Sequence, residues 1–111
     1  MSDAFSIELE QISNYQFDVR FDHPSVPVLR TDESAPLGED RGPNPSRMLV
    51  TAVANCLSAS LLFAMRKFKN EPGPLKTTAS GTIGRNEQNR LRVTGIAVTI
   101  NVALPKSEIA M

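Results

Sequence analysis

The residue with the clearest capacity for chemistry is Cys56, the only cysteine among 111 residues. A lone thiol cannot form a disulfide within its own chain, so it serves either packing or reaction. A thiolate is a nucleophile that peroxides can oxidise, whereas a thiol buried in apolar surroundings without a nearby cation is inert. The surroundings of Cys56 therefore decide between the two roles.

Two arginines flank the loop that leads into the segment around Cys56, and they are the candidate partners of its thiolate. Arg30 precedes this loop and Arg41 lies near its end. For either one alone, a surface charge is the simpler interpretation, and the spacing does not choose between them. Arg47 is a poorer candidate, because at about 3.6 residues per helical turn it points to a different side from Cys56.

The sequence indicates no metal site and no cofactor. His23 is the only histidine, and one histidine with one cysteine gives no recognised ligand spacing. The acidic residues between positions 31 and 44 are interpreted as a solvated loop. The glycines there do not have the spacing of a phosphate-binding loop.

Cys56 lies in an apolar segment that is predicted to be a long helix. Asn44 is a suitable N-cap, Pro45 suits the first helical position, and the helix is expected to run to about Lys69. The segment is near the lower length limit for a membrane span, but its polar residues and its start signal favour the buried helix of a soluble protein. A helix that is apolar on nearly every face needs cover on nearly every face.

Alternating polar and apolar residues before the helix predict β-strands. Residues 5–10 and 15–22 are expected to form a hairpin with one solvated face. Residues 25–29 could add a third strand, which the prolines at positions 24 and 27 confine to an edge of the sheet.

A second hairpin is predicted after the helix, from residues 77–84 and 90–104, with a bend or bulge near Gly95. Residues 105–108 look like the start of another helix. The order of strands, helix and strands predicts an α+β fold in which an antiparallel sheet curves around a buried helix.

Composition narrows the class of protein. Twelve basic and twelve acidic residues give a formal net charge of zero, so no electrostatic footprint for nucleic acid is present. One cysteine and no cationic, apolar leader predict a reduced, cytoplasmic protein. The length predicts one small domain over residues 1–111. Only three residues follow the helix start predicted at residues 105–108, which suggests that the natural chain continues past Met111.

Residues 32–62 resemble the OsmC/Ohr superfamily of thiol-dependent hydroperoxide reductases, and most closely its OsmC-like branch. The matching features are the acidic pair Asp32-Glu33, the segment Gly38–Pro45 that contains Gly-Pro-Asn-Pro, and an apolar helix with a cysteine in its middle. The resemblance implies an intertwined homodimer in which antiparallel sheets wrap around paired central helices.

The resemblance also implies an activity for Cys56. It would attack an organic hydroperoxide as the peroxidatic thiol and become a sulfenic acid, with Arg30 or Arg41 stabilising the thiolate. Family members then use a resolving cysteine and a dithiol reductant. Here no second cysteine is present, so an external thiol would regenerate the protein, and Ser46 and Arg47 occupy the positions of a family glutamate.

The missing glutamate keeps a second interpretation open. The chain could be a catalytically inactive OsmC-like dimer that binds a small apolar ligand or serves as a stress-associated module. A cation beside Cys56 would favour the peroxidase. A Cys56 sealed under apolar side chains would favour the binding module.

Overall fold

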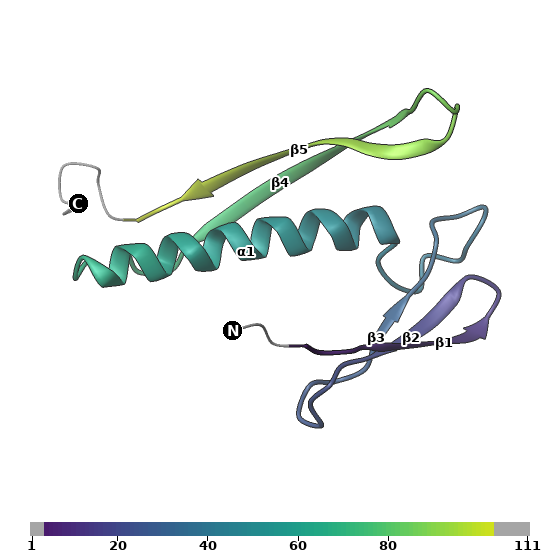
Figure 1. Ribbon diagram of the computed structural model, residues 1–111, viewed down its shortest axis with the longest axis horizontal. Coiled ribbons are helices and arrows are strands. Elements are labelled where there is room, and N and C mark those ends of the chain that lie inside the picture. Colours follow the sequence, from purple (N-terminus) through teal and green to yellow (C-terminus); the bar gives the residue numbers. More distant parts are fainter. Residues whose placement is uncertain (1–3, 104–111) are drawn as a thin grey trace. The chain divides into compact units, whose positions relative to one another are not determined.

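The structure is a computed structural model that describes residues 4–103 of the chain. Its elements follow the predicted order of strands, helix and strands (Figure 1). They are β1 (Glu8–Ser13), β2 (Gln16–Arg20), β3 (Leu29–Thr31), α1 (Pro45–Lys67), β4 (Lys76–Arg85) and β5 (Leu91–Asn101). The α+β class is confirmed, with two antiparallel sheets in place of the single sheet expected; the helix start predicted at residues 105–108 lies outside the described part.

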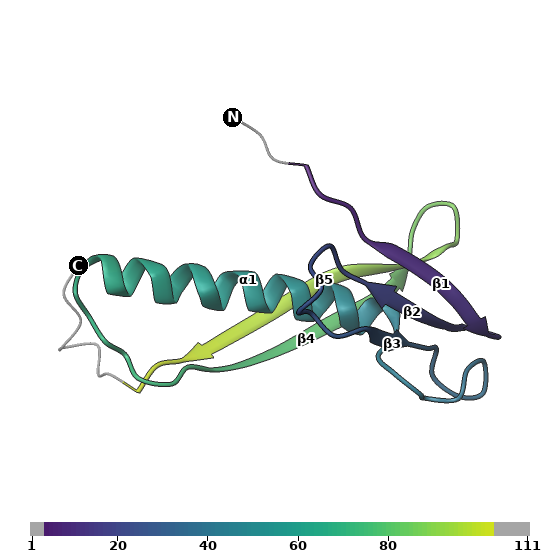
Figure 2. The same cartoon turned by 90° about the horizontal axis from the view of Figure 1, so that it is seen from below.

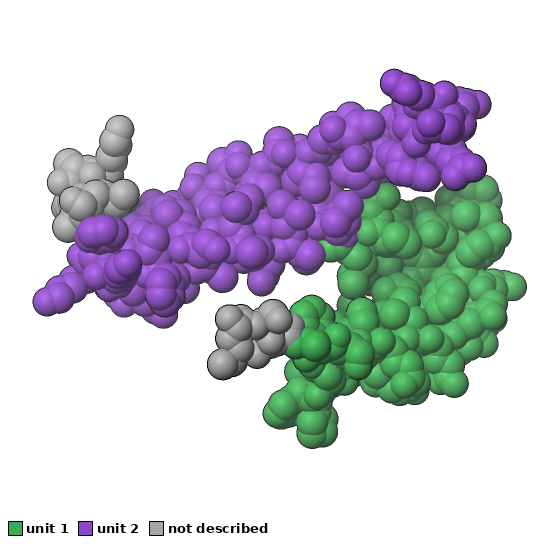
Figure 3. Space-filling view, viewed as in Figure 1, with its two compact units in different colours: residues 1–48 green, residues 49–111 purple. Residues whose placement is uncertain are grey.

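The chain divides into two compact units, residues 1–48 and 49–111 (Figure 3). The first holds the antiparallel sheet β1-β2-β3, in which β2 is the central strand. Val19 pairs with Leu9 on one side and Leu29 on the other, and it is only 4% exposed. The opposite face is polar, since Arg20 contacts Glu10 at 3.2 Å there. The predicted hairpin is confirmed, but its two faces do not differ along β1, where every residue is exposed and the apolar Leu9 is 54% exposed.

The strand limits in this unit differ from the sequence prediction. β1 begins at Glu8, later than expected, and β3 covers Leu29–Thr31 where residues 25–29 were expected. The physical reason is a turn, in which the Val26 N–H donates to the His23 carbonyl at 3.1 Å, followed by Pro27, which has no N–H to give to a ladder. β3 does lie at the sheet edge, as predicted.

Helix α1 begins and ends at clear capping signals. The Asn44 Oδ1 accepts the Arg47 N–H at 2.9 Å, which confirms Asn44 as the N-cap and Pro45 as the first helical residue. The helix ends at Lys67, slightly before the expected Lys69, because Lys69 adopts a left-handed backbone conformation (φ 63°). The Asn70 N–H then bonds to the Met65 carbonyl at 2.9 Å, as in a Schellman cap.

In the second unit, α1 runs along one face of the β4–β5 hairpin (Figures 1 and 2). Thr82 pairs with Gly95 and Ile83 with Val93, so Thr94 has no residue opposite it. This is the bulge predicted near Gly95. The extra residue reverses the alternation, which places Val93 on the same face as Ile96 although their spacing alone would separate them.

The hairpin covers only one side of α1. Of the described helical residues, only Ala54 and Met65 are buried, while Leu49, Leu57 and Phe63 are 48%, 48% and 73% exposed. By length and composition α1 could cross a membrane, a test that core helices of soluble proteins also pass. The predicted burial of this helix is thus not achieved within one chain, because a two-stranded ribbon is narrower than the apolar circumference that it would have to cover.

Candidate functional site

Cys56 lies at the middle of α1 and is a free, exposed thiol. Leu49, Ala52 and Phe63 lie seven and four residues before it and seven after it, on the same side of the helix, and all are exposed. Cys56 therefore occupies the centre of an exposed apolar face, which we call the open face of α1. Within the single chain its thiol is accessible to a small oxidant and is not a core residue.

Arg30, the first candidate partner of the thiolate, is engaged in its own sheet. Its Nε donates to the Asp18 carboxylate on the neighbouring strand β2, and its Nη1 donates to the Gln16 Oε1 at 3.3 Å. The hydrogen bond from Arg30 holds the pKa of Asp18 below its ordinary value. The positive charge of Arg30 is thus already balanced within the polar face of the first unit.

Arg41, the second candidate, is held more loosely. Its Nε lies 3.6 Å from the Glu39 carboxylate, and its side chain is 67% exposed. An exposed contact of this length contributes little energy, so the guanidinium can leave it at small cost. Cys56 belongs to the second unit and both arginines to the first, and the pairing of either arginine with Cys56 stays a prediction.

The sequence analysis missed the role of Asp32, which it took for part of a solvated loop. Asp32 is 2% exposed, the most deeply buried polar residue in the described part of the chain. Its carboxylate accepts the backbone N–H groups of Glu33, Glu39 and Arg41 at 2.7, 3.0 and 3.1 Å. Burial by itself raises the pKa of this carboxyl, but the three donors and the nearby charge of Arg41 together bring it below the ordinary value.

The sequence contained an indirect sign of this arrangement. Gly38 and Gly42 punctuate the loop, and each allows a close backbone approach: a Cβ at either position would lie 2.1 Å from a carbonyl oxygen, that of Glu33 or of Arg30. Positions where such contacts leave no room for a Cβ, so that only glycine fits, indicate a loop that folds tightly on itself. A tight loop needs an internal acceptor for its N–H groups, and Asp32 is that acceptor.

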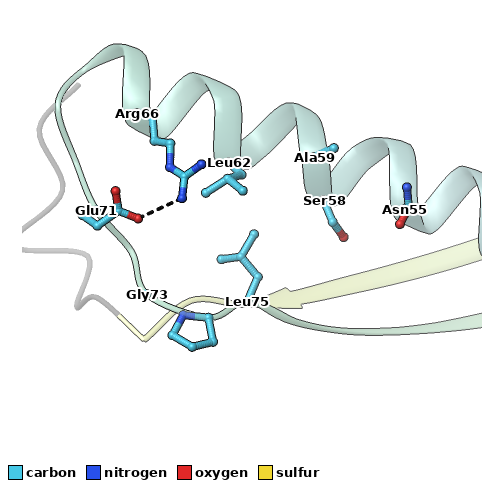
Figure 4. A pocket seen from close by; sticks show the side chains of 9 residues that line it. Asn55, Ser58, Ala59, Leu62, Arg66, Glu71, Gly73 and Leu75 are labelled. Carbon is cyan, nitrogen blue, oxygen red and sulfur yellow. Dashed lines mark hydrogen bonds and ion pairs between the residues drawn. The ribbon is translucent and has the colours of Figure 1, made fainter. Parts of the chain in front are cut away.

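A cavity of about 420 Å³ lies between α1 and the segment that leads into β4 (Figure 4). The Asn55 amide, next in sequence to Cys56, lies at one end, and the ion pair of Arg66 with Glu71 (3.2 Å) lies at the other. The space between them is lined by mostly apolar side chains together with the Ser58 hydroxyl. The lining residues are Asn55, Ser58, Ala59, Leu62, Arg66, Glu71, Gly73, Pro74 and Leu75. The sequence did not reveal this cavity, because it depends on how residues 71–75 return along the helix.

Metal chemistry has no candidate site in residues 4–103, since no three histidine, cysteine, aspartate or glutamate side chains cluster there. His23 is exposed, and its Nδ1 lies 2.7 Å from the Ser25 hydroxyl in the turn before β3. This contact gives His23 a local structural role in the turn.

Comparison with known proteins connects this arrangement to one fold. In sequence, no family model and no curated protein matches the chain. Among solved structures it is similar to a Psychrobacter arcticus 273-4 protein named for osmotic stress induction and a detoxification response, with a TM-score of 0.82 and 12% identity over 97% of this chain and 77% of that one. It is also similar to an OsmC-like protein of unknown function from Vibrio cholerae O1 biovar eltor, with a TM-score of 0.78 and 15% identity over 95% of this chain and 79% of that one. The chain therefore has the OsmC-like fold, and the resemblance that residues 32–62 carry to the OsmC/Ohr superfamily is confirmed at the level of the fold.

Proposed function

We propose that the protein is an OsmC-like dimer that reduces organic hydroperoxides through Cys56 in the cytoplasm. The observation that carries this proposal is the exposed thiol at the centre of the open face of α1. The described part of its own chain does not seal this thiol, so Cys56 is not a core residue of the single chain. The name of the Psychrobacter relative, which refers to a detoxification response, agrees with such a role.

The reaction divides into one oxidation and two thiol exchanges. The Cys56 thiolate attacks one peroxide oxygen, an S–O bond forms, the O–O bond breaks, and the alkoxide leaves and takes up a proton to become an alcohol. Sulfur is oxidised to sulfenic acid and the peroxide is reduced. One external thiol then displaces water to give a mixed disulfide, and a second releases Cys56 and departs as the external disulfide.

Arg41 is the better of the two candidate arginines for stabilising the thiolate. Arg30 already donates to the Asp18 carboxylate and to Gln16, so recruiting it would break an ion pair in the sheet. Arg41 would lose only its 3.6 Å contact with Glu39. With Ser46 and Arg47 at the positions of the family glutamate, no carboxylate of the first helical turn competes for this arginine.

The dimer is proposed because the open face of α1 needs cover. Leu49, Leu57 and Phe63 all expose about half or more of their surface, and contiguous apolar exposure of this kind is typical of an interaction surface. A second copy of the chain would bring a second helix with the same unpartnered face. The two faces would then cover one another, as in an isologous interface.

The peroxidase proposal is tested by trapping the sulfenic acid. The native protein is mixed with one equivalent of an organic hydroperoxide and a sulfenic-acid reagent, and its intact mass is measured. We expect a single adduct that Cys56→Ser abolishes, while Ser60→Ala, a change one helical turn away, retains it. A folded wild-type protein whose thiol stays unmodified would refute the proposal.

The cavity next to Asn55 favours a second candidate, an inactive module that binds a small apolar ligand. The cavity has an amide at one end, an ion pair at the other and mostly apolar walls between them, with one hydroxyl from Ser58. Such a module should bind a fluorescent probe such as anilinonaphthalene sulfonate, and Leu62→Trp, which fills the cavity, should abolish binding. Probe binding without any sulfenic acid adduct would decide for this candidate.

A further inference from the structure

The cavity beside α1 is lined on one side by a single face of the helix. Five helical residues, related by steps of three or four positions, contribute to it: Asn55, Ser58, Ala59, Leu62 and Arg66. Cys56 follows Asn55 in the chain and therefore lies about 100° further around the helix axis. The cavity is thus separate from the thiol and from the open face of α1.

The opposite wall of the cavity is a stiff segment. Residues 72–74 read Pro-Gly-Pro, and Gly73 has a left-handed backbone conformation (φ 73°) that glycine adopts without strain. The proline rings fix φ on both sides of it. Leu75 then faces the helix and forms the apolar walls together with Leu62 (Figure 4). The shape of the cavity is held before a ligand arrives, which reduces the entropic cost of binding.

The Arg66 end of the cavity carries an excess of positive charge. Lys67, Lys69 and Lys76 are close to Arg66 in sequence, whereas Glu71 is the only carboxylate between positions 62 and 76. Within residues 4–103, none of the ion pairs involves a lysine. This imbalance of charge attracts an anion.

The C-terminus of α1 lies at the same end, and its partial negative charge of about half an elementary charge opposes an anion. This charge is reduced because the last carbonyl groups are used within the chain. Those of Ala64, Met65 and Arg66 accept backbone N–H groups of residues 68–70 at distances between 2.9 and 3.3 Å. The surplus of cationic side chains therefore outweighs the effect of the helix end.

Arg66 has donors to spare for a ligand. A guanidinium carries five N–H donors, and within residues 4–103 only the Nη2 group of Arg66 donates, to the Glu71 Oε1 at 3.2 Å. The two side chains are 59% and 69% exposed, and an exposed ion pair contributes little energy. A ligand carboxylate can therefore replace Glu71 at small cost and accept two parallel N–H groups, which is a stronger arrangement.

We propose that the cavity binds an amphipathic monocarboxylate, such as a medium-chain fatty acid. Its carboxylate binds Arg66 in place of Glu71, and its hydrocarbon chain packs between Leu62 and Leu75. This inference rests on the second candidate function, for which it names the class of ligand, and it does not depend on the reactivity of Cys56.

The Ser58 end of the cavity is compatible with the apolar end of such a ligand. The Ser58 hydroxyl donates to the Ala54 carbonyl at 2.8 Å and lies 2.6 Å from the Thr77 hydroxyl. It loses no hydrogen bond when a methyl group packs against it. From Ser58 to Arg66 the helix rises about 12 Å, a length comparable to that of an extended octanoate.

The test compares three probes that share one alkyl chain and differ in charge: octanoate, octanol and octylammonium. Isothermal titration calorimetry measures their binding to the whole chain. We expect octanoate to bind about tenfold more tightly than octanol, because its carboxylate forms charge-assisted hydrogen bonds with Arg66. Octylammonium should bind more weakly than octanol. Octylammonium as the tightest ligand would assign the anchor to Glu71 and overturn the proposal.

Two variants of the ion pair should act in opposite directions. Arg66→Gln removes the anchor and should weaken octanoate about tenfold without affecting octanol. Glu71→Gln removes the competing carboxylate and should tighten octanoate severalfold. The matched control is Lys67→Gln, which removes the same charge at a residue outside the cavity lining and should change octanoate binding by no more than about twofold. Equal weakening in Lys67→Gln and Arg66→Gln would overturn direct contact with Arg66.

A filled cavity tests where the probe binds. Ala59→Phe introduces a ring at an exposed lining residue and should abolish octanoate binding; Leu62→Trp replaces it if circular dichroism shows Ala59→Phe to be unfolded. Cys56→Ser should bind octanoate like the wild type. Octanoate binding that survives in the filled variant would place the probe elsewhere and overturn the proposal.

The remaining outcomes separate this inference from the function on which it rests. If octanol binds as tightly as octanoate and the filled variant abolishes both, the cavity-binding function stands and the carboxylate class is overturned. If neither probe binds the wild type, the cavity-binding function and this inference fail together.

Discussion

Phe63 offers the most direct test of the proposed dimer. It is 73% exposed in the single chain, more than any other large apolar residue of α1. A phenylalanine side chain can bury on the order of 200 Å², and truncation to alanine removes roughly 100 Å² of the part that is exposed here. At about 25 cal/mol per Å², full burial in the dimer corresponds to roughly 2.5 kcal/mol for each copy.

A two-fold interface contains this residue twice, so the loss in Phe63→Ala is roughly 5 kcal/mol for full burial and about half of that for half burial. We therefore expect the dissociation constant of the dimer to rise between about 60-fold and about 4,000-fold. Sedimentation velocity over a dilution series measures the constant for both proteins. The wild type should remain dimeric at concentrations where Phe63→Ala is monomeric.

The matched control is Leu91→Ala. Leu91 is 58% exposed, but it lies at the start of β5 and not on α1. We expect this variant to change the dissociation constant by no more than about twofold. A wild-type protein that is monomeric at all concentrations would refute the dimer, and a Phe63→Ala protein that dissociates like the wild type would show that the open face of α1 is not the interface.

Three further predictions concern the first unit and the helix start. Asn44→Ala removes the acceptor of the Arg47 N–H and should lower the free energy of unfolding by about 1 kcal/mol, measured by urea titration. Gly38→Ala places a Cβ 2.1 Å from the Glu33 carbonyl oxygen; it should lower the melting temperature, while Gly95→Ala, where a Cβ meets nothing within 4 Å, should change it less. The folded-state pKa of Asp32 lies below the ordinary value of 3.8, so its stabilising contribution is complete above the unfolded pKa and is lost as the pH falls through the folded one. The difference in unfolding free energy between wild type and Asp32→Asn should thus be constant from pH 7 to about pH 5 and shrink below about pH 4; a difference that grows on acidification would contradict the cause given for this pKa.

Much of the fold could be predicted from sequence, because its signals are local. The Asn44-Pro45 pair determines where α1 begins, and it does so through one hydrogen bond and one fixed φ angle. The bulge near Gly95 could be predicted because the alternation of apolar residues changes parity there. The predicted end of α1 was less accurate, because a left-handed backbone conformation, as at Lys69, is unusual for a residue with a side chain.

The candidate site was predictable only in part. The middle position of Cys56 in its helix follows from the apolar pattern, but its exposure does not, because exposure depends on how much of α1 one hairpin covers. Asp32 was misread for a related reason: an aspartate among glycines and other acids is usually solvated, and its burial depends on donors seven and nine residues away. The balanced charge of Arg30 depends in turn on the register of β2 with β3.

In the proposed dimer, the open face of α1 has to be covered by the second helix while Cys56 stays accessible to a peroxide. The large side chains Leu49 and Phe63 lie seven residues before and after Cys56, whereas Ala52 and Ser60, one turn away on either side, are small. A covering helix would therefore make its main contacts with the large residues, and the packing would be loosest around the thiol, where the neighbouring side chains are small. An interface of this shape can remove apolar surface from water and still admit a peroxide to its centre. The same helix face can thus serve both the assembly and the reaction proposed here.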